Sequence, residues 1–214
     1  MSRLIDVGLE QLAQIIVRMG DLAHKAVATS LHGYIDGVSS MQQVRDLSDT
    51  LEVIGNEVED KVFELIARYQ PVATDLRVLK SYMKIAYDFA RHGRYALDVS
   101  QIYERLDGAQ ECEGWISESI TQMSDKVLDM VRTSVDSLKS HNAELAKTLA
   151  ENEKQVDQMY FEYLDKLAEK RSATNRCTVS SVLVVRYLER IADHATYTAE
   201  SVVYIATGEK TALR

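Results

Sequence analysis

Residues 19–30 read MGDLAHKAVATS, and residues 123–134 read MSDKVLDMVRTS. Met, Asp, Val, Thr and Ser recur at matching positions of these two stretches with a constant offset. Further along the chain, Arg91 matches Arg190 at a slightly smaller offset. Self-similarity at a nearly fixed spacing is the signature of a duplicated structural unit. We therefore expect two copies of one fold within the 214 residues.

Each copy contains three helical patterns, in which apolar residues recur at spacings of three and four and so share one helix face. Pro71, the chain's one proline, ends the second pattern because it lacks an amide donor and clashes with the preceding turn. Gly108 can stop the third, and the pattern restarts after Gly114. The six stripes start at Ile5, Leu47, Leu79, Ile116, Leu145 and Val184, and they end at Ser30, Leu65, Leu97, Ser134, Leu167 and Ile205.

These patterns predict an all-α fold of two tandem antiparallel three-helix bundles related by internal duplication. The first bundle is expected over residues 1–109 and the second over residues 110–214. A hydrophobic content of 46% is sufficient for a buried core in each bundle.

Charge and composition narrow the function classes. The net charge of -8 argues against nucleic-acid binding, which needs clustered Lys and Arg. Asp6 and Glu10 interrupt the first apolar segment, so no signal peptide is expected, and no apolar stretch is long enough to insert into a membrane. Cys112 and Cys177 form no CxxC pair and are expected to be reduced thiols. A cytoplasmic protein is therefore expected.

The last two helices of the second copy carry paired carboxylates. Glu153 and Asp157 lie four residues apart in ENEKQVD, and Glu189 and Asp193 lie four residues apart in LERIAD. Each pair therefore shares one helix face, where two like charges cost about 0.2–0.5 kcal/mol unless a positive charge compensates.

Two explanations fit these pairs. In the first, Arg186, Arg190 and Lys154 neutralise them as a solvated, salt-bridged surface. In the second, a helical hairpin makes the two helices neighbours, and the four carboxylates converge on one patch that binds a cation. Hard oxygen ligands of this kind suit iron(III), manganese, magnesium or calcium.

Two motifs carry a family resemblance. QPVATDLRVLKSYMKIAYD (70–88) and LERIADHATYTAE (188–200) resemble the QPxAxDLR and LERIGDxAxxIAE signatures of the PhoU family. Members of that family are two duplicated three-helix bundles whose E(D)xxxD motifs hold multinuclear iron or other metal clusters on the bundle surface. The resemblance implies a metal ion in the C-terminal bundle, either iron or one of Mn, Mg and Ca. It assigns the ligands to Glu153, Asp157, Glu189 and Asp193.

The first copy departs from this pattern. Where the family motif has acidic pairs, this chain has Ser48 and Glu52 on the middle helix and Ala90 and Arg94 on the last. The guanidinium of Arg94 would repel a cation, and we expect it to pair with Glu52 across the hairpin. The sequence therefore predicts one metal site in the C-terminal bundle and none in the N-terminal bundle.

The sequence shows no catalytic machinery, so we do not expect an enzyme. A ferritin-like di-iron site needs Glu three residues before His, and none of the five histidines has it. There is no GxxxxGK[ST] phosphate loop and no GxSxG elbow. The histidines are expected on the surface or in packing, with His194 the one candidate to support a metal ligand, because it adjoins Asp193.

Two further features have both a structural and an interaction interpretation. Asp75 opens the third helix, where the helix dipole favours a carboxylate, and the resemblance offers a partner contact instead. Tyrosines around the third helix either pack with satisfied hydroxyls or line a dimer or partner interface. They are Tyr69, Tyr82, Tyr87, Tyr95 and Tyr103.

The resemblance implies a regulator of phosphate uptake and phosphate homeostasis, a metal-binding adaptor that restrains a phosphate ABC transporter by binding its ATPase subunit. A sensor kinase is a further partner if the source is bacterial, and a homodimer is expected. YDFARHGRYALD (87–98) looks closer to archaeal relatives, which argues against the kinase. The alternatives are a carboxylate-bridged metal storage protein or metalloenzyme, and a metal-free helical scaffold.

Overall fold

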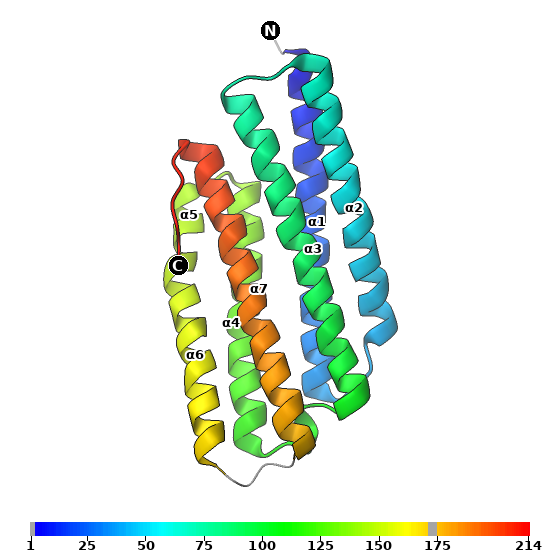
Figure 1. The fold of residues 1–214 in the computed structure, drawn as a ribbon, viewed down its shortest axis with the longest axis vertical. Coiled ribbons are helices and arrows are strands. Elements are labelled where there is room, and N and C mark those ends of the chain that lie inside the picture. The colour runs from blue at the N-terminus through cyan, green and yellow to red at the C-terminus, as the bar shows by residue number, and fades with distance from the viewer. Residues whose placement is uncertain (1–2, 171–174) are drawn as a thin grey trace.

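The computed structural model describes residues 3–170 and 175–214. Six long helices form two three-helix bundles that lie side by side in an elongated molecule (Figure 1). The predicted all-α tandem bundle is confirmed. The elements are α1 (Leu4–Asp36), α2 (Met41–Tyr69), α3 (Thr74–Leu106), the 3-10 turn η1 (Ala109–Glu111), α4 (Gly114–Lys139), α5 (Ala143–Lys147), α6 (Leu149–Glu169) and α7 (Asn175–Thr207).

The first bundle consists of α1, α2 and α3, and its turns follow from local sequence. Helix α2 ends where Gln70 adopts a left-handed conformation with φ of 47°, directly before Pro71. Asp75 in the first turn of α3 accepts two hydrogen bonds from the guanidinium of Arg3, at 2.7 and 3.0 Å. The carboxylate expected to interact with the helix dipole therefore also joins the start of α1 to the start of α3.

The second bundle consists of α4, α6 and α7, with α5 as a short turn before α6. The single middle helix that the apolar stripe predicts is interrupted at Thr148, whose hydroxyl donates to the carbonyl of Leu145 at 2.7 Å. Asn142 begins α5, because its side-chain oxygen accepts from the amide of Leu145 at 3.0 Å. The two bundles meet where α3 lies along α7 and α1 along α4 (Figure 1).

A disulfide joins the connection between the bundles to the start of α7. Cys112 follows η1, Cys177 lies in the first turn of α7, and their Cα atoms are 5.5 Å apart. The prediction of two reduced thiols is therefore wrong. The two cysteines are 65 residues apart, and no spacing motif in the sequence indicates that the fold brings them together.

Among the described residues, no helix combines the length and the apolar character needed to cross a membrane. The apolar stripes instead face the interior of the two bundles, where Leu12, Ile16, Val58, Ile120 and Leu188 are among the fully buried side chains.

Candidate metal centre and the buried seam

The four predicted carboxylates lie on two neighbouring helices of the second bundle, with Glu153 and Asp157 on α6 and Glu189 and Asp193 on α7. We call them the acidic cluster. The charges of Asp157 and Asp193 both raise the pKa of Glu153, so the two pairs face one another rather than opposite sides of the bundle. Glu153 is buried, with a relative solvent accessibility of 6%.

Burial is the largest cause of raised pKa values in the acidic cluster. It raises the pKa of Glu153, Glu189 and Asp193, and the neighbouring carboxylates raise each of them further. A buried carboxylate among like charges is costly because both desolvation and repulsion disfavour its ionised form. A bound cation would lower that cost.

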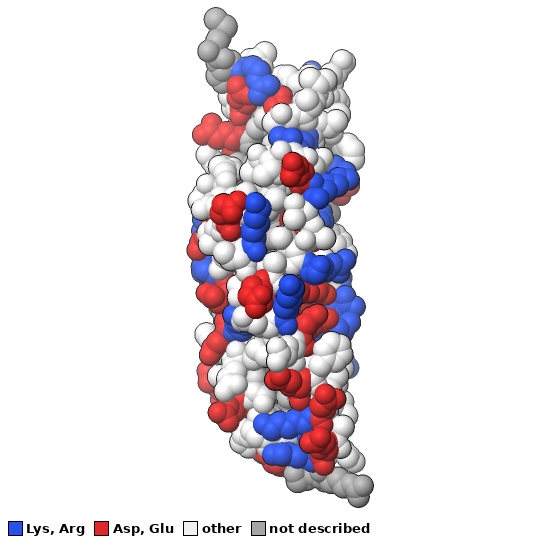
Figure 2. All heavy atoms as spheres, turned by 90° about the vertical axis from the view of Figure 1, so that its left-hand side faces the viewer, with Lys and Arg blue, Asp and Glu red and all other residues white. Residues whose placement is uncertain are grey.

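Arginines neutralise part of this charge. Arg186 pairs with Glu189 at 2.7 Å, and Arg190 pairs with Asp193 at 3.6 Å. Figure 2 likewise shows basic and acidic side chains interspersed on the face that lies to the left in Figure 1. Among the described residues, the Oε2 atom of Glu189 is nevertheless buried without a hydrogen-bond partner, and the Nε atom of Arg190 lies 4.0 Å from it.

A third positive charge, after Arg186 and Arg190, reaches the acidic cluster from the segment after α7. Residues 208–214 fold back along the helix, and we call them the fold-back segment. Leu213 is buried, and its amide donates to Glu200 at 3.1 Å. Arg214 stacks on the ring of Tyr197 at 4.8 Å, and its charge lowers the pKa of both Glu153 and Asp193.

The described side chains contain no group of three or more His, Cys, Asp or Glu arranged to hold a metal ion. In this structure the acidic cluster therefore adopts its salt-bridged form. The unsatisfied oxygen of Glu189 and the raised pKa values still fit a cation, because both mark negative charge that the arginines do not fully compensate.

The corresponding positions of the first bundle differ, as the sequence indicates. Arg94 pairs with Asp98 at 3.8 Å on its own helix, and the ion pairs of the described residues include none between Arg94 and Glu52, so the predicted pair across the hairpin is wrong. Helices α2 and α3 also approach closely here. A Cβ atom on Gly93 would lie 3.3 Å from the Cα atom of Ser48 and 2.6 Å from the Leu51 side chain.

Polar residues that the sequence analysis did not connect meet at the seam between α3 and α7. Asp88 on α3 is 2% exposed and lies 2.8 Å from the Nδ1 atom of His194 on α7. The Nε2 atom of His194 is 3.5 Å from the hydroxyl of Tyr95, which accepts a hydrogen bond from Arg91 at 2.8 Å. His194 therefore supports the contact between the bundles, through a partner on the other bundle.

His92 lies in the same seam and is completely buried. Its Nε2 atom is 3.0 Å from the carbonyl oxygen of Ile191, and its Nδ1 atom has no hydrogen-bond partner in the described part of the chain. Burial, and after it the charge of the nearby His194, lowers the pKa of His92 to about 3. His92 is thus a neutral packing residue, one of the two outcomes expected for the histidines.

The fold and the site define a class: a tandem three-helix-bundle protein with a carboxylate cluster on its second bundle. The model of the PhoU domain matches residues 16–103 and 120–202. The chain therefore belongs to the PhoU family.

Named relatives agree with this assignment. The chain is 31% identical to the phosphate-specific transport system accessory protein PhoU homolog of Clostridium acetobutylicum, over 97% of this chain and 96% of that protein. It is 30% identical to the homolog of Pseudomonas aeruginosa, over 97% of this chain and 87% of that protein. The archaeal likeness suggested by YDFARHGRYALD finds no support in these bacterial relatives.

Solved structures show the same fold. The crystal structure of PhoU from Pseudomonas aeruginosa superposes with a TM-score of 0.89 at 29% identity, covering 96% of this chain and all of the other. The phosphate transport system regulatory protein PhoU from Streptococcus pneumoniae superposes with a TM-score of 0.87 at 22% identity, covering 97% and 99% of the two chains.

Proposed function

We propose that this chain is an accessory regulator of phosphate-specific transport that acts in the cytoplasm by binding partners and catalyses no reaction. The observation that carries the proposal is the likeness along nearly the whole chain to proteins named as phosphate-specific transport accessory proteins. A match over both bundles is more informative than a shared motif, because it includes the surfaces as well as the core. The expected partner is the ATPase subunit of a phosphate ABC transporter, with a sensor kinase as a second partner in a bacterium.

The transport role has a direct test. Phosphate uptake is measured in cells that lack this chain and in cells in which it is restored, after growth with ample phosphate. Cells lacking the chain are expected to take up excess phosphate, and capture with the purified ATPase subunit is expected to recover the chain. Unchanged uptake together with no capture would refute the adaptor role. Size-exclusion chromatography of the same preparation tests the expected homodimer.

We also propose that the acidic cluster binds a metal ion, with iron first among the candidates and manganese, magnesium or calcium as the others. Glu153, Asp157, Glu189 and Asp193 would hold it, and it would supply positive charge between α6 and α7. The unsatisfied Oε2 atom of Glu189 supports this proposal. The salt bridges of Arg186 and Arg190 oppose it, since both would have to open.

Metal content decides between these forms. The protein is purified without chelator and its metals are measured by mass spectrometry, alongside Glu189→Ala with Asp193→Ala. The matched control is Asp165→Ala with Glu169→Ala, an exposed carboxylate pair with the same spacing on α6. Metal loss in the first variant alone supports the site. Equal metal content in all three proteins would favour the metal-free, salt-bridged surface.

A further inference from the structure

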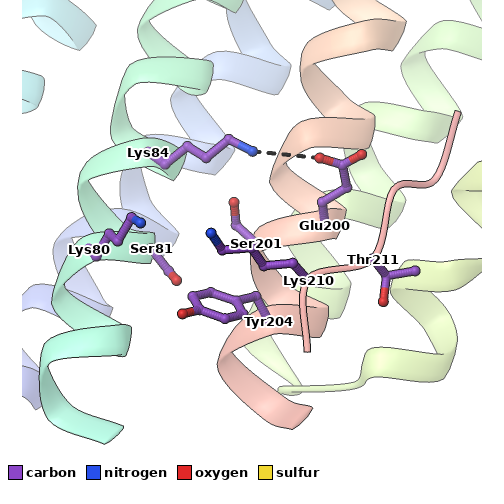
Figure 3. Close-up of a pocket in the computed structure, with 8 residues that line it drawn as sticks. All are labelled: Lys80, Ser81, Lys84, Glu200, Ser201, Tyr204, Lys210 and Thr211. Carbon is purple, nitrogen blue, oxygen red and sulfur yellow. Dashed lines mark ion pairs between the residues drawn. The ribbon is translucent and has the colours of Figure 1, made fainter. Parts of the chain in front are cut away.

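A second charged site lies at the seam, away from the acidic cluster. A cavity of about 290 Å³ lies between α3, α7 and the fold-back segment. Figure 3 shows the side chains that line it. Its walls thus come from both bundles. The cavity is lined by Lys80, Ser81, Lys84, Glu200, Ser201, Tyr204, Lys210 and Thr211.

The cavity has more positive than negative charge. Its one carboxylate, on Glu200, already has a partner at each oxygen. Lys84 lies 3.6 Å from one oxygen, and the amide of Leu213 donates a hydrogen bond to the other at 3.1 Å. Lys80 and Lys210 form no ion pair within the described part of the chain. The cavity therefore holds two ammonium groups, on Lys80 and Lys210, in excess of its one carboxylate, which pairs with Lys84. Figure 3 shows Lys210 extending from the fold-back segment toward α3.

A fourth cation, after Lys80, Lys84 and Lys210, lies next to the cavity beside Tyr204. The guanidinium of Arg77 is 5.9 Å from the centre of the Tyr204 ring, and its Nε atom is buried without a hydrogen-bond partner. Gly208, where the fold-back segment begins, has φ of +81°, and a Cβ atom there would lie 2.4 Å from Arg77. The glycine thus allows the backbone to turn closely over this arginine.

Four hydroxyl groups line the cavity, and they differ in whether their protons are free to form a hydrogen bond with a ligand. Ser81 and Ser201 donate to carbonyl oxygens of their own helices, at 2.9 and 3.0 Å, so their protons are already used. Tyr204 and Thr211 form no such bond within the described residues and remain available as donors. Together with the lysines they present several donors and positive charges to one small volume.

We propose that this cavity is an anion pocket that binds a phosphate group, either inorganic phosphate or the phosphate of a small monoester. An oxyanion with two negative charges matches two unpaired ammonium groups, and its oxygens accept from the hydroxyls. The lining comes from α3, α7 and the fold-back segment, so a ligand here contacts both bundles at once. The site is separate from the acidic cluster and does not require the transport role.

The test is calorimetric titration at low salt with inorganic phosphate, and separately with adenosine monophosphate as the monoester. The pocket variant is Lys80→Gln with Lys210→Gln. The control removes the same charge elsewhere, by Lys25→Gln on α1 with Lys126→Gln on α4. Losing charge-assisted hydrogen bonds is expected to weaken binding about 10- to 100-fold in the pocket variant and to leave the control within about twofold of wild type.

The two ligands separate the sources of phosphate. Binding of inorganic phosphate assigns the pocket to the free ion, whereas binding of the monoester alone assigns it to a phosphorylated small molecule. No binding of either ligand to the wild-type protein overturns the proposal, as does equal weakening in the pocket and control variants. Lys210→Arg, which keeps the charge, is expected to retain binding, and circular dichroism of each variant checks that it is folded.

Discussion

Acid should destabilise this protein through His92, whose side chain is sealed between α3 and α7. A carbonyl oxygen can only accept, so the Nε2 atom that faces Ile191 carries the proton of the neutral ring. A second proton would go to Nδ1, which is buried without a partner. The positive charge would then be desolvated and would face His194, whose ring centre is 6.3 Å away. These two effects keep the imidazole neutral in the folded protein.

The magnitude follows from the pKa. The pKa of His92 falls from the ordinary 6.5 to about 3 on folding. Between these two pH values the unfolded chain binds a proton at His92 that the folded chain does not. The contribution of neutral His92 to the unfolding free energy is therefore fully present above pH 6.5 and is lost as the pH falls below it. The slope is about 1.4 kcal/mol per pH unit, and lowering the pH from 7 to 5 therefore costs about 2 kcal/mol.

The assay is urea unfolding at pH 7, 6 and 5 for wild type, His92→Gln and the exposed control His32→Gln. Glutamine keeps a donor for the carbonyl of Ile191 but does not titrate. The difference in unfolding free energy between wild type and His92→Gln is expected to shrink by about 2 kcal/mol from pH 7 to pH 5. The raised carboxyl pKa values act in the opposite direction, but they are common to all three proteins. A difference that stays constant with pH would refute the reasoning.

Three further changes test other parts of the structure. Glu153→Gln should stabilise the metal-free protein at pH 7 by about 0.5 kcal/mol in urea unfolding, because burial and like charges raise the pKa of this carboxyl. That gain should vanish as the pH falls and the wild-type carboxylate is protonated. A variant less stable than wild type at pH 7 would contradict the prediction. Cys112→Ser with Cys177→Ser should lower stability by about 4 kcal/mol, as expected for a crosslink between residues 65 apart; rapid alkylation of both thiols in the unreduced wild type would show that the bond is absent. Gly108→Ala should cost about 1–3 kcal/mol by thermal or urea unfolding, because its Cβ would lie 2.4 Å from a backbone oxygen of α1, whereas Gly114→Ala, with nothing within 4 Å, should be neutral.

Periodicity in the sequence was sufficient to predict the helices and their grouping into two bundles. Pro71 and Gly114 also marked helix boundaries correctly: α2 ends just before Pro71, and α4 begins at Gly114. Both residues act on the local backbone. The acidic cluster was predictable for the same reason: its members lie four residues apart on helices that a hairpin makes neighbours.

The sequence did not indicate the contacts that depend on how the two bundles pack against each other. Asp88 and His194 are 106 residues apart and carry no shared motif, yet they form the buried pair of the seam. Arg94 pairs with Asp98 one turn further along its own helix. That pair depends only on the helix itself, whereas a pair with Glu52 also depends on how α2 packs against α3. Residues 208–214 follow the last apolar stripe and show no periodicity, so nothing in the sequence placed them against α7.

The fold-back segment connects the two proposed ion sites. Lys210 lines the anion pocket, Leu213 anchors the segment in the core, and Arg214 acts on the acidic cluster. A cation at the cluster would compete with Arg214, and an anion in the pocket would hold Lys210, so both ligands would act on the fold-back segment. Binding linkage is reciprocal, and if metal alters the affinity for phosphate, phosphate must alter the affinity for metal by the same factor.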